Sequence, residues 1–163
     1  QGKFGGSLEL IQDQTVSSVG HIDFTSIKES KFDVHILLLN NITSTANLNA
    51  GYQFYESGIL RTASDYDYAQ YYGTRLGSFA GQSSTGETRI VGPNFFSANP
   101  TSGIAYFYDL GDSSKFSYCT YQNWVDGQYL FQFGSGVSPL TCLVYTSGTA
   151  ISGNARLYGV KKV

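Results

Sequence analysis

The stretch FDVHILLLN (residues 32–40) decides the fold class. Apolar residues between Val34 and Leu39 fall on both parities, so an extended segment here would be apolar on both faces. This pattern is typical of a central strand in a packed sheet, covered on both sides. The run is strand-sized, and no apolar run in the chain approaches the roughly 20 residues that span a bilayer, so we expect no membrane insertion.

Runs of comparable length recur along the chain with the alternation that strands show. No helical period intervenes between them, which favours two packed antiparallel sheets. We therefore predict one all-β domain, an antiparallel β-sandwich of the jelly-roll type, over residues 7–163, after a flexible lead-in over residues 1–6. The expected strands are 8–12, 19–24, 32–40, 48–55, 69–75, 88–91, 104–110, 116–122, 128–133, 141–146 and 155–161.

Turn-forming residues separate these strands. Residues 57–69 and 92–103 form the two long irregular loops, and loops held by a rigid sandwich are where a binding function is expected. A single helical turn is expected around residues 26–30. Hairpin turns or loops are expected at residues 40–41, 111–114, 126–127 and 134–136.

The composition suits strands and turns and argues against nucleic-acid binding. Gly (19), Tyr (13) and Phe (11) are abundant, Met is absent, and charged residues make up 13%. The net charge is −2 and the basic residues are scattered, so we expect no nucleic-acid partner. Cys119 and Cys142 lie in expected strands, where buried thiols are favoured over a disulfide.

The signals for metal binding or catalysis are weak. His21 with Asp23, and Asp33 with His35, are two residues apart and would share a strand face as a ligand pair does. Such pairs arise readily by chance, and no G-x-S-x-G elbow, P-loop or Rossmann fingerprint is present. We therefore expect no catalytic residue, metal or cofactor. The carboxylates that a glycosidase could use are solvated acids of a polar segment: Glu56, Asp65 and Asp67.

Aromatic residues supply the candidate contact residues. Aromatic rings stack on sugars, and Tyr and Trp are favoured interface anchors. The alternative is that alternate members are core residues, which we favour for the strand at 52–55. The candidate interface or glycan contacts lie near the 57–69 loop and the turn at 126–127: Tyr66, Tyr68, Tyr121, Trp124 and Asp126.

Three stretches carry a resemblance to known proteins: GSLELIQDQTVSSVGHIDFTSI (6–27), KFDVHILLLNNITSTANLNAGYQF (31–54) and TSGTAISGNARLYGVKK (146–162). They are similar to a family of tailed-bacteriophage virion proteins, whose members open with a T-x-S-S-x turn and an "IDFTxI" strand and close on "ISGxxRLYGxKK". The resemblance covers most of the chain and is weakest over residues 57–103.

The resemblance implies a jelly-roll sandwich without enzymatic activity that assembles on the virion, as a capsid decoration or cement protein or as a tail-fibre module. The implied partners are the major capsid protein or fibre and tail proteins, and the implied location is the particle surface. A closed homo-oligomer is expected, with a trimer favoured. The alternative is a carbohydrate-binding module, at a fibre tip or secreted and lectin-like, whose aromatics contact a host surface glycan. An enzyme such as a depolymerase is the third hypothesis.

Overall fold

The computed structural model describes residues 7–74, 76–95, 97, 99–111, 115–125, 129–138, 141–145 and 150–161, with side chains except at 93, 129–138 and 141–145. These residues form strands, turns and bends and contain no helix. The described part of the chain accordingly offers no helical segment able to cross a membrane. The helical turn expected at 26–30 does not form. Residues 28–31 instead make one hydrogen-bonded turn, in which the Lys31 N–H donates to Lys28 O over 2.9 Å.

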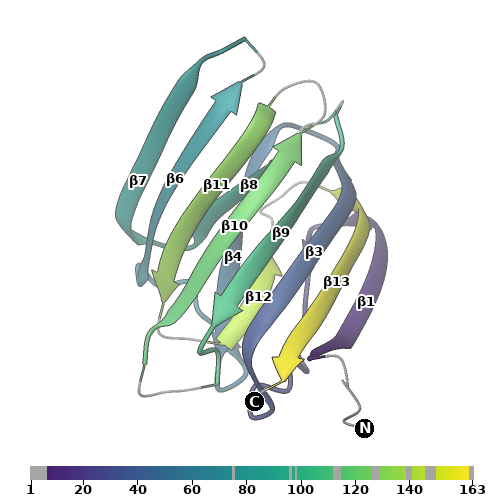
Figure 1. Cartoon of the computed structure of the whole chain (residues 1–163), viewed down its shortest axis with the longest axis vertical. Coiled ribbons are helices and arrows are strands. Elements are labelled where there is room, and N and C mark those ends of the chain that lie inside the picture. Colours follow the sequence, from purple (N-terminus) through teal and green to yellow (C-terminus); the bar gives the residue numbers. More distant parts are fainter. Residues whose placement is uncertain are drawn as a thin grey trace, which may run out of the picture.

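The described strands form two antiparallel sheets that pack face to face (Figure 1). The eight-stranded sheet has the order β1 (Leu8–Val19), β13 (Ile151–Lys161), β3 (Phe32–Ser44), β9 (Thr101–Tyr108), β10 (Ser117–Val125), β11 (Tyr129–Ser138), β6 (Tyr66–Thr74), β7 (Phe79–Glu87). The five-stranded sheet has the order β2 (His21–Ile22), β12 (Thr141–Tyr145), β4 (Leu48–Glu56), β5 (Ile59–Leu60), and β8 (Ile90–Phe95) also pairs with β4. The predicted antiparallel sandwich is confirmed, whereas jelly-roll connectivity stays a prediction.

Strand β3 lies inside the eight-stranded sheet between β13 and β9, as its sequence predicts. Three alternate side chains of β3 face the smaller sheet and are buried: His35, Leu37 and Leu39. On the opposite face, Val34, Ile36 and Leu38 are half-buried. The described residues place no second layer over that face, so the coverage of both faces that the sequence suggested is only partial.

An aromatic cluster joins the two sheets. Tyr52 of β4 packs edge-on against Phe107 of β9 with ring centroids 5.3 Å apart, and tilted against Tyr121 of β10 at 5.8 Å. Phe54, two residues along β4, contacts Phe107 at 6.1 Å and Tyr66 of β6 at 5.9 Å. All are fully buried, and burial of each large apolar side chain stabilises the fold by about 1.5–3 kcal/mol.

Two expected loop signals lie inside strands. The glycines at 134 and 136 belong to β11, where Gly134 pairs with Tyr121 and Gly136 with Cys119. In this register each glycine neighbours a buried residue of β10, and a glycine inside a strand marks such a close approach. Asn41 lies within β3, at a bulge where its φ is +51°, so the Asn40-Asn41 pair that predicted a loop is accommodated without ending the strand.

The long loops are also shorter than expected. β5 forms within 57–69, and β6 begins at Tyr66. β8 continues to Phe95, and β9 begins at Thr101. β7 was not predicted at all, because its polar, glycine-containing sequence lacks the alternation of a half-buried strand. As an edge strand it is held by backbone pairing with β6.

Cys119 is a buried free thiol, as predicted. Burial raises the pKa of this thiol well above its ordinary value, so it behaves as a small apolar side chain. The side chain of Cys142 lies outside the described residues.

Gly159 lies directly against an aromatic ring of the neighbouring strand in the eight-stranded sheet. A Cβ built at this position of β13 would lie against the ring of Phe32, the first residue of β3, which is fully buried. The ring cannot retreat to solvent without leaving the core. Glycine is therefore required here by contact with an aromatic ring.

We predict that Gly159→Ala lowers the free energy of unfolding by about 1–3 kcal/mol, because the added methyl group overpacks the Phe32 ring. Urea denaturation measures this change. The matched control is Gly20→Ala, since a Cβ there meets nothing within 4 Å. Equal midpoints for the two variants would contradict the packing described.

Candidate functional site

Three of the predicted contact residues are buried. Tyr66, Tyr68 and Tyr121 are 0%, 6% and 1% exposed, so none of them presents a ring face to a ligand. Their prediction as interface or glycan contacts is therefore wrong. All three point from the eight-stranded sheet into the sandwich.

Tyr66 and Tyr121 can be buried in this core because their hydroxyl groups form hydrogen bonds with residues outside their own sheet. The Tyr121 hydroxyl lies 2.8 Å from Val91 O in β8. The Tyr66 hydroxyl donates to Arg61 O and accepts from the N–H of Phe54, both over 3.0 Å. Burial raises the pKa of Tyr121, so the phenol stays protonated and links the two sheets.

Trp124 is the predicted contact residue that the structure exposes. It lies on β10 with its side chain on the opposite face from Tyr121, and it is 49% exposed. Its neighbour across the sheet is Ser102 of β9. Asp126 lies outside the described residues.

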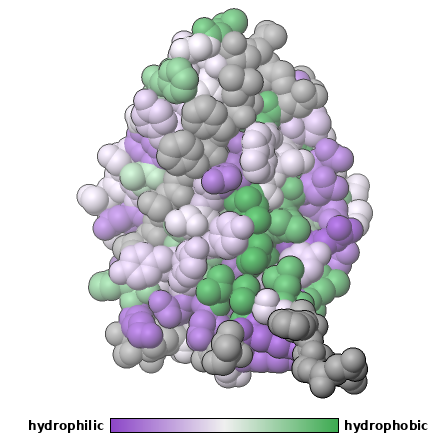
Figure 2. Space-filling view, viewed as in Figure 1, coloured by the Kyte–Doolittle hydropathy of each residue, from purple (hydrophilic) through white to green (hydrophobic). Residues whose placement is uncertain are grey.

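The outer face of the eight-stranded sheet, turned away from the smaller sheet, is unusually apolar. The register aligns apolar residues on five adjacent strands, and Figure 2 shows hydrophobic side chains gathered over β9, β3 and β13. We call this set the outer patch: Leu8, Leu10, Val34, Ile36, Leu38, Ile104, Tyr106, Tyr108, Tyr118, Tyr158 and Val160.

The outer patch is ordered in rows across the strands. In one row Leu8, Val160, Val34, Tyr108 and Tyr118 lie side by side. The next row starts at Leu10 and runs through Tyr158, Ile36 and Tyr106. Cross-strand neighbours of this kind touch, which leaves the aliphatic side chains of β3 half-buried between tyrosines.

Aromatic exposure continues on the far strands of the same face. Tyr71 of β6 and Phe79 of β7 stack with ring centroids 6.4 Å apart, and Phe79 is 61% exposed. In the register, Tyr71 pairs with Gly81, and a Cβ built there would contact the Tyr71 ring. Glycine at 81 therefore gives this ring room to lie over the edge strand.

Few charges occur on the outer face. Those on its described strands include Asp13, Arg156 and Asp67, and the exposed Asp33 lies beside Val34 near the start of β3. Arg156 Nε donates to Asp13 over 2.8 Å, and hydrogen bonds from Asn154 and from Arg156 hold the pKa of Asp13 below its ordinary value. Asp67 accepts from the N–H of Gly86 over 3.0 Å. Depletion of charge with enrichment in aromatic residues is the composition of an interface core.

The predicted contact residues do not include the outer patch of this face, because contact residues were expected in loops and turns. The sequence signal for this face lies in residues 34–38, 104–108 and 158–160. In these segments the residues on both sides of an extended strand are nearly all apolar or aromatic. We interpreted this pattern on β3 as coverage by a second layer. The structure shows that the second set of side chains is instead turned outward.

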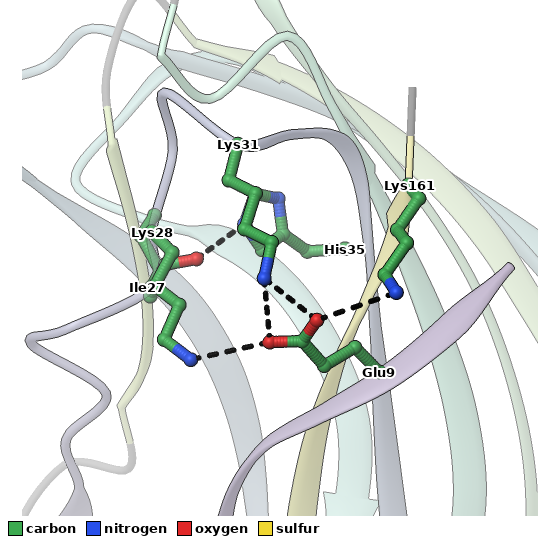
Figure 3. Close-up of polar contacts among 6 residues, drawn as sticks. All are labelled: Glu9, Ile27, Lys28, Lys31, His35 and Lys161. Atoms are coloured by element: carbon green, nitrogen blue, oxygen red, sulfur yellow. Dashed lines mark hydrogen bonds and ion pairs between the residues drawn. The ribbon is translucent and has the colours of Figure 1, made fainter. Parts of the chain in front are cut away.

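A lysine cluster lies at one end of the sandwich (Figure 3). The Glu9 carboxylate is 2.7 Å from Lys31 Nζ, 3.3 Å from Lys28 Nζ and 3.9 Å from Lys161 Nζ. The hydrogen bond from Lys31 is the main reason that the pKa of Glu9 is lowered. These side chains are well hydrated, so each pair contributes little to stability, and together they hold the 28–31 turn against β1.

His35 lies beneath this turn, fully buried. Its Nε2 is 2.8 Å from Ile27 O, and within the described residues its Nδ1 has no hydrogen-bond partner. Burial lowers the pKa of His35, partly offset by the hydrogen bond to Ile27 and by the charges of Glu29 and Asp33. The neutral ring thus donates to Ile27 O and fixes the segment that carries it.

The two His–Asp pairs behave differently. His21 Nε2 and Asp23 Oδ2 are 3.1 Å apart, which confirms that this pair shares a side of the chain. Asp33 is exposed whereas His35 is buried, because the register between β3 and β13 shifts at this point; the prediction of a shared face is wrong there. Over the described part of the chain, no three His, Cys, Asp or Glu side chains converge as metal ligands would.

Two of the three candidate glycosidase carboxylates, Glu56 and Asp65, are held by one arginine. Arg61 lies 3.2 Å from Glu56 and 2.6 Å from Asp65, in contacts open to solvent. A cavity of about 520 Å³ nearby contains the single carboxylate of Glu29 among apolar and hydroxyl-bearing residues. At Arg61 the two carboxylates share one guanidinium, and the cavity has a single carboxylate among its lining residues, whereas glycoside hydrolysis uses two carboxyl groups that flank the bond to be cut.

Comparison with known proteins gives no match: no family model fits the chain, and no curated protein or solved structure is significantly similar. The functional argument therefore depends on the residues of this chain.

We predict that acidification destabilises the fold through His35. Burial lowers the pKa of His35 below the unfolded value of about 6.5, so the unfolded state binds a proton first as the pH falls. The stability that the neutral His35 contributes is therefore fully present above about pH 6.5 and is lost as the pH falls toward the pKa of the folded state. Urea midpoints at about pH 7.5 and about pH 5 measure the loss. His35→Gln should reduce the difference, whereas the exposed His21→Gln should retain it. An unchanged pH dependence in His35→Gln would exclude this origin.

Proposed function

We propose that this chain is a non-enzymatic structural protein of a tailed-phage virion, which acts by docking through the outer patch. A single observation carries the docking role: apolar and aromatic side chains cover five adjacent strands on a face that the fold itself leaves open. Monomeric proteins rarely expose apolar patches beyond about 300–600 Å², and patches of that size are often functional.

The sandwich presents this face in a fixed shape. The inner faces of the two sheets are locked together by buried aromatics, so the outer side chains need little reorganisation on binding. A preorganised surface loses less conformational entropy when a partner docks. This supports repeated docking of identical subunits, as a virion requires.

The virion assignment is supported by where the phage-like stretches lie. Residues 6–27 contain β1, residues 31–54 contain β3, and residues 146–162 contain β13. These strands are adjacent in the eight-stranded sheet and carry much of the outer patch. On this proposal the partners are the major capsid protein or fibre and tail proteins, and the chain lies on the particle surface as a decoration, cement or fibre module.

A carbohydrate-binding module is the second candidate. Trp124 favours it, because a half-exposed indole beside the polar residues Ser102 and Gln122 could stack on a sugar ring while hydroxyl and amide groups contact its substituents. These polar neighbours occur at the margin of the outer patch. The larger aliphatic area suits a protein partner better than a sugar.

We predict that antibodies against the chain label intact particles of the phage that encodes it, at regularly repeated positions seen by electron microscopy. Particles made without the chain should not label, and if it is a cement protein they should lose heat resistance that added protein restores. Absence of the chain from purified particles would contradict the virion role.

We predict a blank glycan array for the soluble protein, because aliphatic side chains, which bind no sugar hydroxyl, make up most of the outer patch. Binding that is lost in Trp124→Ala and retained in Phe116→Ala would instead support the carbohydrate-binding candidate. Phe116 is a suitable control because it is exposed but lies outside the strands of the outer face.

A further inference from the structure

We infer that the occupant of the outer patch is a second copy of this chain, with the two eight-stranded sheets packed face to face about a two-fold axis. This inference rests on the proposed docking role and names a second copy, in place of a capsid, fibre or tail protein, as the partner that covers the outer patch. Three properties of the face carry it: its area, its charge and the order of its strands.

The area is sufficient for a specific dimer. The five strands of the outer patch, about 4.8 Å apart, span about 24 Å, and the rows of outward side chains extend for about 24 Å along them, so the overlapping face covers roughly 580 Å² on each copy. Two such faces bury about 1,150 Å² in total, which exceeds the roughly 1,000 Å² expected of a biological interface. The outer patch forms the apolar centre, and polar residues such as Thr120, Gln122 and Asn154 lie at its margin.

The charge of the face allows it to meet an identical face. A surface with one dominant sign of charge would repel its own copy. Here Asp13 and Arg156 neutralise each other, and Asp67 lies on β6, away from the outer patch. Docking of two copies therefore brings no unpaired charge into the apolar centre. A strongly charged partner, by contrast, would find nothing complementary on this face.

The order of the strands makes the patch self-complementary. Its strands run β1, β13, β3, β9 and β10, with β3 in the middle. A two-fold axis along β3 places β1 of one copy over β10 of the other, so Leu8 and Leu10 meet Tyr118 of the partner subunit. Sheets packed in this way cross at about 30°, with interdigitating side chains. Such an isologous contact closes a dimer, in place of the trimer that the family resemblance favours.

Sedimentation equilibrium of the purified full chain tests this inference. The wild type should show twice the 17.8 kDa chain mass, and the dimer should weaken roughly tenfold or more in Leu10→Lys and in Tyr118→Lys, which place charge where β1 of one copy meets β10 of the other. Both positions are about half-exposed, so the substitutions leave the core unaltered. The matched control is Ile59→Lys, an equally non-polar position that is 70% exposed on the other sheet and should leave the dimer intact.

The opposite outcomes are distinct. A monomer at all concentrations, a trimer, or a dimer that only Ile59→Lys dissociates would overturn the inference. Circular dichroism checks that each variant folds, and if one fails the other decides. A monomeric wild type whose binding to phage particles is abolished by Tyr118→Lys would overturn the second-copy occupant and leave the docking role standing. A wild type that neither forms a dimer nor binds phage particles would remove the docking role as well.

Discussion

The contact between Tyr52, Phe107 and Tyr121 is the constraint on which the rest of the structure depends. These rings come from both sheets and meet in the centre of the sandwich, where no water reaches them. Side chains alternate along a strand, so fixing Phe107 and Tyr121 inward fixes Tyr106, Tyr108 and their neighbours outward. Packing on one face of the large sheet thus determines what its other face displays.

The outer face carries more apolar surface than the fold needs. A sheet with one solvated face normally alternates apolar and polar residues. Here β3, β9 and β13 are apolar or aromatic on both parities near the middle of the sheet. Exposed apolar area of this kind weakens solubility unless a partner covers it, so its concentration on five adjacent strands is the main reason to assign a docking role to this protein.

The sequence predicted the sandwich because strand formation follows local patterns: the strand-sized apolar run from Val34 to Leu39, and alternating runs separated by turn-forming residues. It did not predict β7, an edge strand whose structure comes from pairing with β6 and not from its own side chains. It misplaced Tyr66 and Tyr121, because the partners that allow a phenol to be buried, Arg61 O and Val91 O, are set by tertiary packing. The outer patch needed the register of five strands, which no local pattern contains.

Oxidative footprinting of aromatic side chains tests the docking claim most directly. Reactivity would be compared between the dilute, isolated chain and the chain in the assembly purified from its source. We predict that Tyr118 and Trp124 lose reactivity on assembly, while the exposed Phe116 keeps it. Equal reactivity of Tyr118 and Trp124 in the two states would contradict the account, because the outer face would then be open where the protein works.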